Sequence, residues 1–443
     1  MRKWAAPICL TGGLQELIWI ASWEIGPFRE NTVYFLALML GAFLLCIWGF
    51  AKLAVPNRAA ASLIIAFGFL FRLTVLPELP YQSEDVYRYI WDARVAAEGI
   101  SPYKYPPEAP ELERLRDEAI YPMINSKPYI TAYPPLSQAL FRFSRTMFGE
   151  SLTGMKAIFS MFEFCALLIV WGLLSALGQN FRSLLLIAWN PLFIFEFSQS
   201  GHSDSVMIFM ILLSLYLLQR GRKIPALLGY SGAVLSKLHP ALWLPLYVRC
   251  AGWKAVIPGM IAGGALAYSF FDLGGVLRYL SSLRLYYRLF EFNAGIHYLL
   301  RGIGQACFQQ SWDKITGPFL AAALIGITLV IWRKFPVRST QDVLHAGFWI
   351  MTADLCLSTT VHPWYLSWAA LALPFFPYAF MLYWTGAVFL SYAAYAYHPV
   401  YEPWWALVLE YIPMYGLMAW EICRGGPLLA TVSESRPQRR KDR

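Results

Sequence analysis

A long polar stretch interrupts an otherwise apolar chain. Residues 81–138 read YQSEDVYRYIWDARVAAEGISPYKYPPEAPELERLRDEAIYPMINSKPYITAYPPLSQ. This stretch is dense in Asp, Glu, Arg, Tyr and Pro, and it follows directly on the hydrophobic run at 59–76. A polar segment of this length between apolar blocks is either a solvated loop or a functional site. Its opening pair, Glu84 and Asp85, is expected at the mouth of a membrane helix, near the lipid headgroups.

The acidic pair has two interpretations. The first is helix capping, because Ser83, Glu84 and Asp85 precede a stretch at 86–98 with helical spacing, and such residues suit the positive end of a helix. The second makes Asp85 a general base, because a carboxylate at a water-poor boundary can have the raised basicity needed to take a proton from a sugar hydroxyl. Both roles can hold together.

The composition indicates a helical membrane protein. Of 443 residues, 58% are hydrophobic and only 14% are charged, which is too apolar for a soluble enzyme of this size. The apolar residues come in blocks, a span needs about 20 of them, and backbone polar groups must be satisfied within each span. Aromatic residues make up 17% of the chain, and many Trp and Tyr fall near block ends, as in an interfacial belt.

These blocks predict an all-α polytopic membrane protein with about 12–14 transmembrane helices. The candidate spans are 4–24, 32–53, 59–77, 154–178, 183–200, 203–219, 224–237, 239–250, 254–271, 318–333, 344–360, 364–377, 379–397 and 403–423. Residues 1–58 form a two-span extension whose first span is taken as uncleaved, and 59–423 form the membrane core. The basic tail at 424–443 is expected to be disordered and cytoplasmic.

The net charge of +9 is interpreted as orientation in the membrane, not as nucleic-acid binding. Lys and Arg occur mainly in short loops and the tail, and placing both termini in the cytoplasm collects most of these cations inside. The long loops at 78–153 and 272–317 then lie outside, together with every His except His345.

The outer loops are expected to carry helices next to the membrane. In the first loop, 86–98 has helical spacing and ends at Gly99. Residues 110–119 are expected to form a charged surface helix. Residues 136–148 are amphipathic and are expected to lie along the membrane interface.

Ionisable residues at membrane depth are costly, so each marks a candidate site. His202 and Asp204 join two spans: they form a polar turn with Asp204 as the N-cap, or they bind a sugar or a phosphate. An HxD pair alone is weak evidence for a metal. Lys237 and His239 either snorkel to the interface or neutralise a lipid phosphate.

The second loop and a later turn add further candidates. Arg284 and Arg288 either lie on an amphipathic surface helix or clamp an anionic headgroup, since Arg recognises phosphate bidentately. His362 is either a hydrogen-bonded turn residue or a site residue, beside aromatic residues that fit an interfacial belt. Three acids lie within or near spans without an assignable partner: Glu163, Glu196 and Asp354.

Motifs of nucleotide and metal chemistry are absent from the sequence. It has no P-loop, GxSxG, HExxH or dinucleotide fingerprint, and its seven scattered Cys include no CxxC pair. We expect no disulfide framework, no zinc site and no cofactor. An enzyme without a cytoplasmic nucleotide domain must use an already activated, lipid-borne donor, and a site on the outer face agrees because nucleotide sugars are cytoplasmic.

Several motifs together resemble one family. SEDVYRYIWDARVAAEGISPYKYPP at 83–107 and AYPPLSQALFRFSRTMFGES at 132–151 resemble the first outer loop of GT-C glycosyltransferases. The likeness is closest to bacterial polyprenyl-phosphate-mannose-dependent mannosyltransferases, and it extends to the eukaryotic enzyme that adds the first mannose to glycolipid anchors. Three later patches are similar to the bacterial group: AWNPLFIFEFSQSGHSD, SKLHP and VHPWYLSW.

The resemblance implies a GT-C-like membrane fold and a hexosyltransferase that uses a polyprenyl-phosphate-linked donor, usually with inversion. It implies Asp85 as the catalytic base, with Glu84 as its neighbour and substitute, and Tyr133 at the entrance. Cations that stabilise the leaving phosphate are candidates: Lys237, Arg284, Arg288, His202 and His362. Enzymes of this kind generally need no metal.

The implied partners are the lipid-linked donor, a lipid or glycan acceptor and membrane lipids, in the plasma membrane of a bacterium. A transporter or flippase for lipid-linked sugars is the alternative, and a non-catalytic scaffold is a third. Transport favours charges along the spans and at both faces. Here the polar clusters gather on one face, which favours a transferase.

Overall fold

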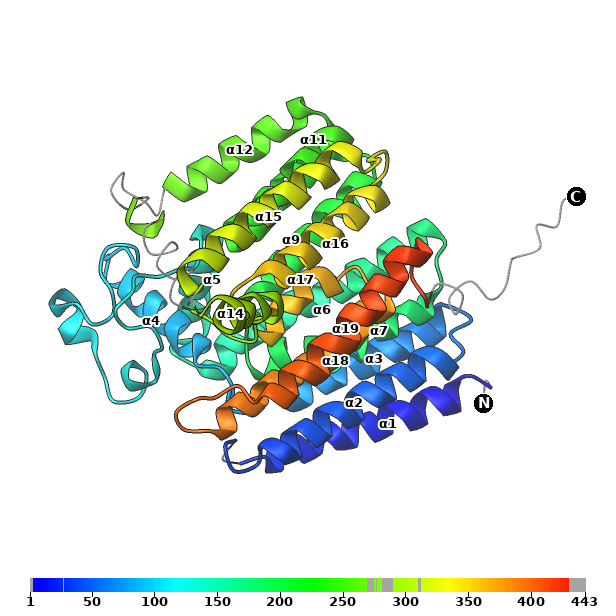
Figure 1. Ribbon diagram of the computed structural model, residues 1–443, viewed down its shortest axis with the longest axis horizontal. Coiled ribbons are helices and arrows are strands. Elements are labelled where there is room, and N and C mark those ends of the chain that lie inside the picture. Colours follow the sequence, from blue (N-terminus) through cyan, green and yellow to red (C-terminus); the bar gives the residue numbers. More distant parts are fainter. Residues whose placement is uncertain are drawn as a thin grey trace, which may run out of the picture.

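The computed structural model describes residues 3–26, 28–268, 275, 277–280, 290–309 and 312–429. Within these residues the secondary structure is helical, apart from one isolated bridge between Phe292 and Thr360. Figure 1 shows long helices running side by side, with the irregular segments around α4 (Asp85–Ala97) at one end of the bundle. The all-α class predicted from composition is confirmed.

The helices from the N-terminus to Tyr268 fall into two groups along the chain. The opening group comprises α1 (Ala5–Ala21), α2 (Thr32–Lys52), α3 (Arg58–Val75), α4, η2 (Pro110–Leu115), η3 (Tyr121–Met123) and α5 (Pro135–Phe148). The next group comprises α6 (Leu152–Leu177), η4 (Phe181–Leu184), α7 (Leu185–Ala188), α8 (Pro191–Ile194), η5 (Phe195–Gln199), α9 (Asp204–Gln219), α10 (Lys223–Ser236), η6 (His239–Trp243), α11 (Leu244–Ala251) and α12 (Trp253–Tyr268).

The remaining helices complete the bundle. They are α14 (Gly295–Phe308), α15 (Asp313–Lys334), α16 (Thr340–Leu357), η7 (Pro363–Leu366), α17 (Ser367–Ala370), α18 (Ala379–Ala387), η8 (Val388–Ala396) and α19 (Trp404–Arg424).

Six helices of the described chain are long and apolar enough to cross a membrane, and a bent pair raises this to seven. Other predicted spans coincide with helices outside this set, such as α9, with 16 residues, and α16, with 18 residues. The range 364–377 does not form the continuous helix we expected. Pro363, Pro374 and Pro377 divide it into short turns, because proline lacks an amide hydrogen and clashes with the preceding helical turn.

The bent pair is important because its second half leads into residues of the site. Its two halves, Phe181–Ala188 and Pro191–Gln199, meet at 50°. The bend frees backbone carbonyls, and side chains from other helices satisfy them: Arg72 Nη1 donates to Ala188 O at 2.9 Å, and Gln15 Nε2 donates to Trp189 O at 2.6 Å. The second half ends in a π-helical turn, a feature that often marks functional sites.

The first two helices pack into the same core as the rest. Phe35 of α2 contacts the rings of Phe195 and Tyr392, with centroids 5.1 and 5.6 Å apart. The segment 28–30, between α1 and α2, reaches the main cavity. The residues predicted as an N-terminal extension therefore contribute to the centre of the molecule.

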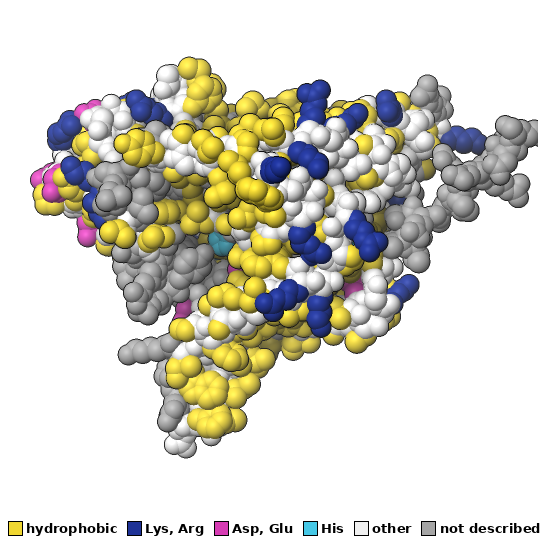
Figure 2. Space-filling view, turned by 90° about the horizontal axis from the view of Figure 1, so that it is seen from above, with side chains coloured by type: hydrophobic (Ala, Val, Ile, Leu, Met, Phe, Trp, Pro, Cys, Tyr) yellow, Lys and Arg dark blue, Asp and Glu magenta, His cyan; other side chains and the backbone are white. Residues whose placement is uncertain are grey.

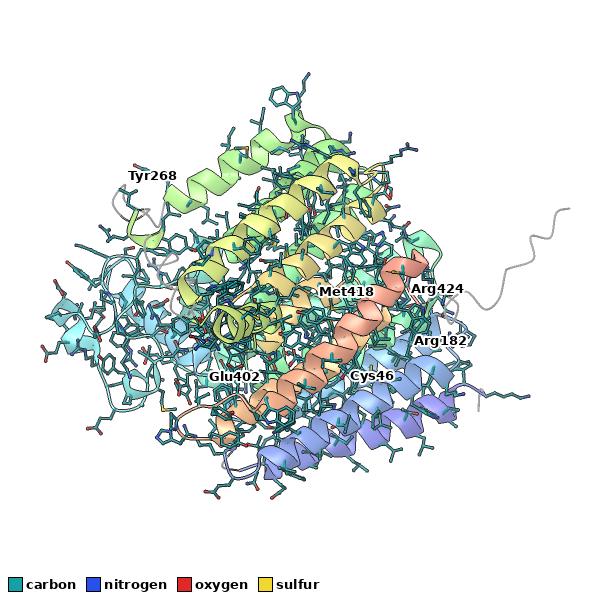
Figure 3. The ribbon with its side chains drawn as sticks, viewed as in Figure 1. Cys46, Arg182, Tyr268, Glu402, Met418 and Arg424 are labelled. Atoms are coloured by element: carbon teal, nitrogen blue, oxygen red, sulfur yellow. The ribbon has the colours of Figure 1, made fainter. Side chains whose placement is uncertain are left out.

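The two ends of the bundle differ in charge. Arg182 and Arg424 lie toward one end, whereas Glu402 and Tyr268 lie toward the other (Figure 3). On the face seen in Figure 2, many Lys and Arg are spread toward the end that carries the tail, while the opposite end carries Asp and Glu together with further Lys and Arg. The loops of the acidic end carry the first polar stretch.

The first loop folds largely as predicted. The helix expected at 86–98 is α4, it ends before Gly99 with its left-handed φ of +74°, and the amphipathic helix expected at 136–148 is α5. The charged helix expected at 110–119 is wrong beyond Leu115. There the Asp117 carboxylate accepts hydrogen bonds from the amides of residues 120 and 121, which closes a turn in place of a further helical one.

Candidate active site

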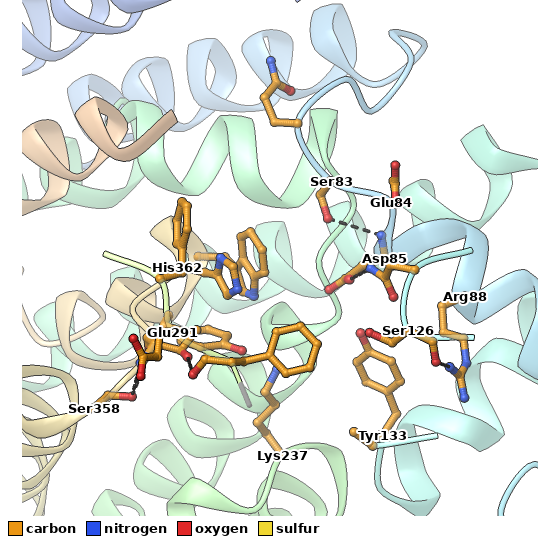
Figure 4. A pocket seen from close by; sticks show the side chains of 18 of the residues that line it. Ser83, Glu84, Asp85, Arg88, Ser126, Tyr133, Lys237, Glu291, Ser358 and His362 are labelled. Atoms are coloured by element: carbon orange, nitrogen blue, oxygen red, sulfur yellow. Dashed lines mark hydrogen bonds between the residues drawn. The ribbon is translucent and has the colours of Figure 1, made fainter. Parts of the chain in front are cut away.

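A cavity of about 1000 Å³ opens at the acidic end of the bundle. Segments far apart in the sequence converge on it: 28–30, 81–85, 125–134, 237–239, 290–292 and 354–368. Figure 4 shows Asp85, Tyr133, Lys237 and His362 around the same space. The cavity is large enough for a sugar and part of a second substrate.

Asp85 opens α4 but does not cap it. Ser83 Oγ accepts a hydrogen bond from the Asp85 amide at 3.3 Å, while the N-cap residue, Glu84, makes no side-chain capping bond. The Asp85 carboxylate instead accepts a hydrogen bond from Asn125 Nδ2 at 2.9 Å and lies 3.6 Å from His202 Nδ1. The capping interpretation therefore applies to Ser83, and the Asp85 carboxylate is left facing the site.

The pKa values of the two acids move in opposite directions. Burial and the charge of Asp85 raise the pKa of Glu84. Burial also opposes ionisation of Asp85, but the interaction with His202 and the hydrogen bond from Asn125 outweigh it and hold the pKa of Asp85 below its usual range. The raised basicity expected for Asp85 is therefore wrong, because a buried cationic partner compensates for the water-poor surroundings.

Lys237, the C-cap residue of α10, supplies a fixed positive charge. Its Nζ lies 3.0 Å from the Asp204 carboxylate, which also accepts a hydrogen bond from Trp368 Nε1 at 2.6 Å. The ammonium group also lies 5.3 to 6.0 Å from the ring centroids of Tyr133, Tyr365 and Trp368. One carboxylate and three rings thus hold this cation at the cavity wall.

A stack of flat rings adjoins the rings around Lys237 and runs from the buried His202 to the cavity wall. His202 stacks on Trp364 with centroids 3.6 Å apart, Trp364 stacks on His362 at 4.4 Å, and His362 stacks on Phe292 at 4.9 Å. Burial lowers the pKa of His362 to about 3. His362 is therefore neutral near pH 7, so it can exchange hydrogen bonds with a ligand but does not supply the charge expected of a phosphate-binding cation.

His202 lies behind this wall between two carboxylates. Its side chain is 0% exposed, with Nδ1 facing Asp85 at 3.6 Å and Nε2 facing Glu196 at 3.3 Å. Burial alone would lower the pKa of His202, but the two carboxylates outweigh it and raise that pKa. Tyr392 Oη in turn donates to Glu196, with Oε1 at 2.9 Å.

The predicted site residues divide into three groups. Those that line the cavity are Asp85, Glu84, Lys237, His239, His362 and Tyr133. His202 and Asp204 are buried behind its wall, because their polar atoms face Asp85, Glu196 and Lys237 and not the cavity. The geometry therefore does not support direct contacts between these two residues and a sugar or a phosphate. Arg284 and Arg288 lie outside the described residues.

Two of the three acids without an assignable partner find one. Glu163 Oε1 accepts a hydrogen bond from Arg72 Nη2 at 2.6 Å. Asp354 only approaches His239, at 3.7 Å, which is beyond hydrogen-bond distance. Glu196 pairs with His202, as described above. The sequence does not predict a role for Asn125, since an Asn in a proline-rich loop carries no pattern that identifies it as a partner of a distant carboxylate.

Metal binding is not indicated by the donor set. Among the residues that the structure describes, no group of three or more His, Cys, Asp or Glu side chains could hold a metal ion. The charged side chains that line the cavity include Asp85, Glu84 and Lys237, together with Arg29, Arg88 and Glu291. Such a site can hold an anionic group near the lysine and accept a proton at the carboxylate.

Comparison with known proteins identifies relatives of one kind. The family described as alpha-(1->6)-mannopyranosyltransferase, N-terminal domain, matches residues 11–252, which is more than half of the chain. Alpha-(1->6)-mannopyranosyltransferase A of Mycobacterium tuberculosis (strain ATCC 25618 / H37Rv) is 21% identical over 367 residues, which cover 76% of this chain and 69% of the relative. No solved structure matches the chain. The family match includes α2, α3, Asp85 and Lys237.

Proposed function

The chain belongs to the alpha-(1->6)-mannopyranosyltransferase family, and from that premise we propose its specific reaction. It transfers mannose from a polyprenyl-phosphate-linked donor to a lipid or glycan acceptor on the extracytoplasmic face of a bacterial plasma membrane. Asp85 is the general base. The observation that carries this proposal is the cavity that holds Asp85 and Lys237 on its wall.

Topology supports the choice of face. With both termini in the cytoplasm, every segment that lines the cavity belongs to an outer loop or to the outer end of a helix. The short loops that carry Arg58, Arg182, Arg220 and Arg338 then lie inside. A donor available on the outer face is a lipid phosphate sugar, because nucleotide sugars are made in the cytoplasm. This one-sided arrangement also favours a transferase over a transporter.

The reaction uses two charges of opposite sign. The acceptor O–H bond breaks as its proton passes to the Asp85 carboxylate, and the acceptor oxygen forms a bond to the anomeric carbon. The bond from that carbon to the phosphate oxygen breaks, and polyprenyl phosphate leaves with the electron pair. Lys237 stabilises the charge on the leaving phosphate. Attack from the side opposite to the phosphate inverts the anomeric centre.

A low pKa suits Asp85 in this reaction. The carboxylate is ionised throughout the neutral range. It can therefore accept a proton at any pH in that range. When the bond to a good leaving group such as phosphate breaks early, the acceptor hydroxyl becomes acidic late in the step, and a weak base is then sufficient. The aromatic rings of Tyr133 and Tyr365 line the cavity and provide surfaces on which a sugar can pack.

The donor assignment is tested by supplying purified protein in liposomes with radiolabelled polyprenyl-phosphate-mannose, and in parallel with radiolabelled GDP-mannose. Envelope lipids extracted from bacteria serve as acceptors. We expect label in the acceptor fraction from the lipid-linked donor alone. Transfer from GDP-mannose in the absence of any polyprenyl phosphate would contradict the proposal.

A further inference from the structure

We propose that Glu196 and His202 form a buried row of interacting charges, called the relay below, that keeps Asp85 ionised. Glu196 holds His202 as an imidazolium from behind the cavity wall. This inference rests on the proposed role of Asp85. Neither residue touches the cavity, so both are positioning residues. The relay runs from Tyr392 through Glu196 and His202 to Asp85.

The backbone holds the histidine in place. Gly201 has φ of +79°, and a Cβ atom there would lie only 2.6 Å from Lys156 Cγ, so the position demands glycine on two counts. The His202 amide donates to Glu196 O at 3.0 Å, directly after the π-helical turn. This turn places the Glu196 side chain and the His202 ring on the same side. The backbone position of His202 is thus fixed by backbone hydrogen bonds, and its ring packs against Trp364.

The surroundings favour a charged ring. A neutral His202 would leave two carboxylates of the same sign on either side of a 0% exposed side chain, which is costly in a medium of low dielectric constant. Protonation reduces the net charge of the group from −2 to −1 and places a cation against the face of Trp364 at 3.6 Å. Both distances to the carboxylates exceed 3.2 Å, so the coupling is that of ion pairs more than of short hydrogen bonds.

Other titratable groups face this cluster from the elements packed against it. The positive ones are Lys237 from α10 and, if protonated, His362 from the turn before η7. The negative or neutral ones are Asp204 from α9, Glu84 from the start of α4, and Tyr392 and Tyr395 from η8. Lys237 is paired with Asp204, whereas the two ring nitrogens of His202 face Asp85 and Glu196.

The proton balance of turnover follows from this arrangement. Before reaction, Asp85 and Glu196 are carboxylates and His202 is an imidazolium. The proton of the acceptor hydroxyl passes to Asp85, and it later leaves for the solvent through the open cavity. His202 and Glu196 keep their own protonation states throughout, so no further reactant is needed.

The test is the pH profile of kcat/KM for mannose transfer in Glu196→Gln. Removing one carboxylate makes His202 lose its proton more easily, Asp85 then loses its cationic neighbour, and its pKa rises toward an ordinary value. We expect the acidic limb of the profile to move to higher pH by about one unit, which is a roughly tenfold lower kcat/KM on that limb. Activity on the plateau above the limb should be largely retained.

Four further variants make the result specific. Glu196→Asp keeps the charge and should return the limb most of the way, and His202→Asn should move it at least as far as Glu196→Gln. The matched control is Glu410→Gln, since Glu410 is equally buried and accepts hydrogen bonds from Trp384 and Asn293. Its limb should stay where it is. If Glu196→Gln does not fold, as judged by gel filtration, Tyr392→Phe should give a smaller shift in the same direction.

The outcomes separate this inference from the proposed function. An acidic limb that does not move in Glu196→Gln, or a loss of rate that is equal at every pH, would overturn the relay while Asp85→Asn remains inactive. Full turnover by Asp85→Asn would instead remove Asp85 as the base, whatever the limb does. A limb that moves in Glu196→Gln and returns in Glu196→Asp supports the relay.

Discussion

Lys237 illustrates how a single charge can be held at membrane depth. Its ammonium group pairs with Asp204, and the rings of Tyr133, Tyr365 and Trp368 surround it. The side chain is only 15% exposed, so solvent screens its charge weakly. A phosphate entering the cavity would therefore meet a cation that is already oriented and largely desolvated.

Lys237→Met is expected to weaken donor use. One charge-assisted contact to phosphate is worth about 1.5–3 kcal/mol, so the KM for the lipid-linked donor should rise roughly tenfold to a hundredfold. Transfer at varied donor concentration measures this effect.

Two controls accompany that measurement. Lys104→Ala removes a lysine that is exposed and does not line the cavity, and it should leave the KM unchanged. Lys237→Met alone leaves the buried Asp204 carboxylate without its cation, which should lower thermal stability. Adding Asp204→Asn should recover that stability without recovering the donor KM. A normal donor KM in Lys237→Met would exclude the phosphate contact.

The sequence could identify single residues better than their partners. Asp85 and Lys237 stand out because ionisable groups near apolar runs are expensive, and both lie on the cavity wall. Asn125 and Glu196 could not be linked to Asp85 in the same way, because they lie about 40 and 110 positions away and only the fold brings them together. The direction of the Asp85 pKa depends on those same partners, and for that reason the sequence led to the wrong sign.

At the scale of elements, one buried ion pair joins the helices around the bent pair. Arg72 of α3 donates to Glu163 of α6 and to the backbone oxygens of Gly68 and Ala188. Both charged side chains are 1% exposed. The guanidinium group thus connects two long helices and satisfies a carbonyl that the bend has released.

Arg72→Met should be strongly destabilising, by about 3–5 kcal/mol, because it leaves Glu163 charged, buried and unpaired. Adding Glu163→Met should recover only part of this loss, since Ala188 O still lacks its donor. Thermal unfolding in detergent measures both. Arg58→Ala, an exposed arginine at the start of the same helix, should change stability by less than about 0.5 kcal/mol. Equal unfolding temperatures for Arg72→Met and the unaltered protein would contradict this account.

Periodicity predicted the elements well where local interactions dominate. The helices expected at 86–98 and 136–148 form because hydrophobic spacing and a following glycine or preceding proline agree with each other. The predictions fail at 110–119 and 364–377, where a side chain that accepts backbone hydrogen bonds or a set of prolines competes with the helix. The bend near Asn190 was also not predicted, because the backbone carbonyls that it exposes accept hydrogen bonds from side chains that lie far away in the sequence.

At the scale of the molecule, the cavity lies at one end of the bundle, and a group of arginines lies at the other end. The cavity draws on loops from 28–30 through 354–368, and α2 packs directly behind it. In the orientation that we propose, Arg182 and Arg338 are cytoplasmic and the cavity is extracytoplasmic. This proposal follows the rule that positive loops remain inside.

Cysteine labelling tests this orientation in intact bacteria. In a variant whose seven native cysteines are replaced by serine, Glu118→Cys should react with a membrane-impermeant maleimide from outside. Arg338→Cys, also exposed but at the opposite end, should react only after the membrane is permeabilised. The reverse pattern would place the cavity in the cytoplasm and would exclude the proposed donor.

The most direct test of the account is turnover by Asp85→Asn beside Glu84→Gln. Radiolabelled polyprenyl-phosphate-mannose is the donor, and both variants are first shown to fold by gel filtration. We predict that Asp85→Asn loses transfer by a factor of roughly 10²–10⁴, whereas Glu84→Gln, which removes the neighbouring acid of higher pKa, keeps most of it. Normal turnover by Asp85→Asn, or loss in Glu84→Gln alone, would contradict the assignment of Asp85 as the base.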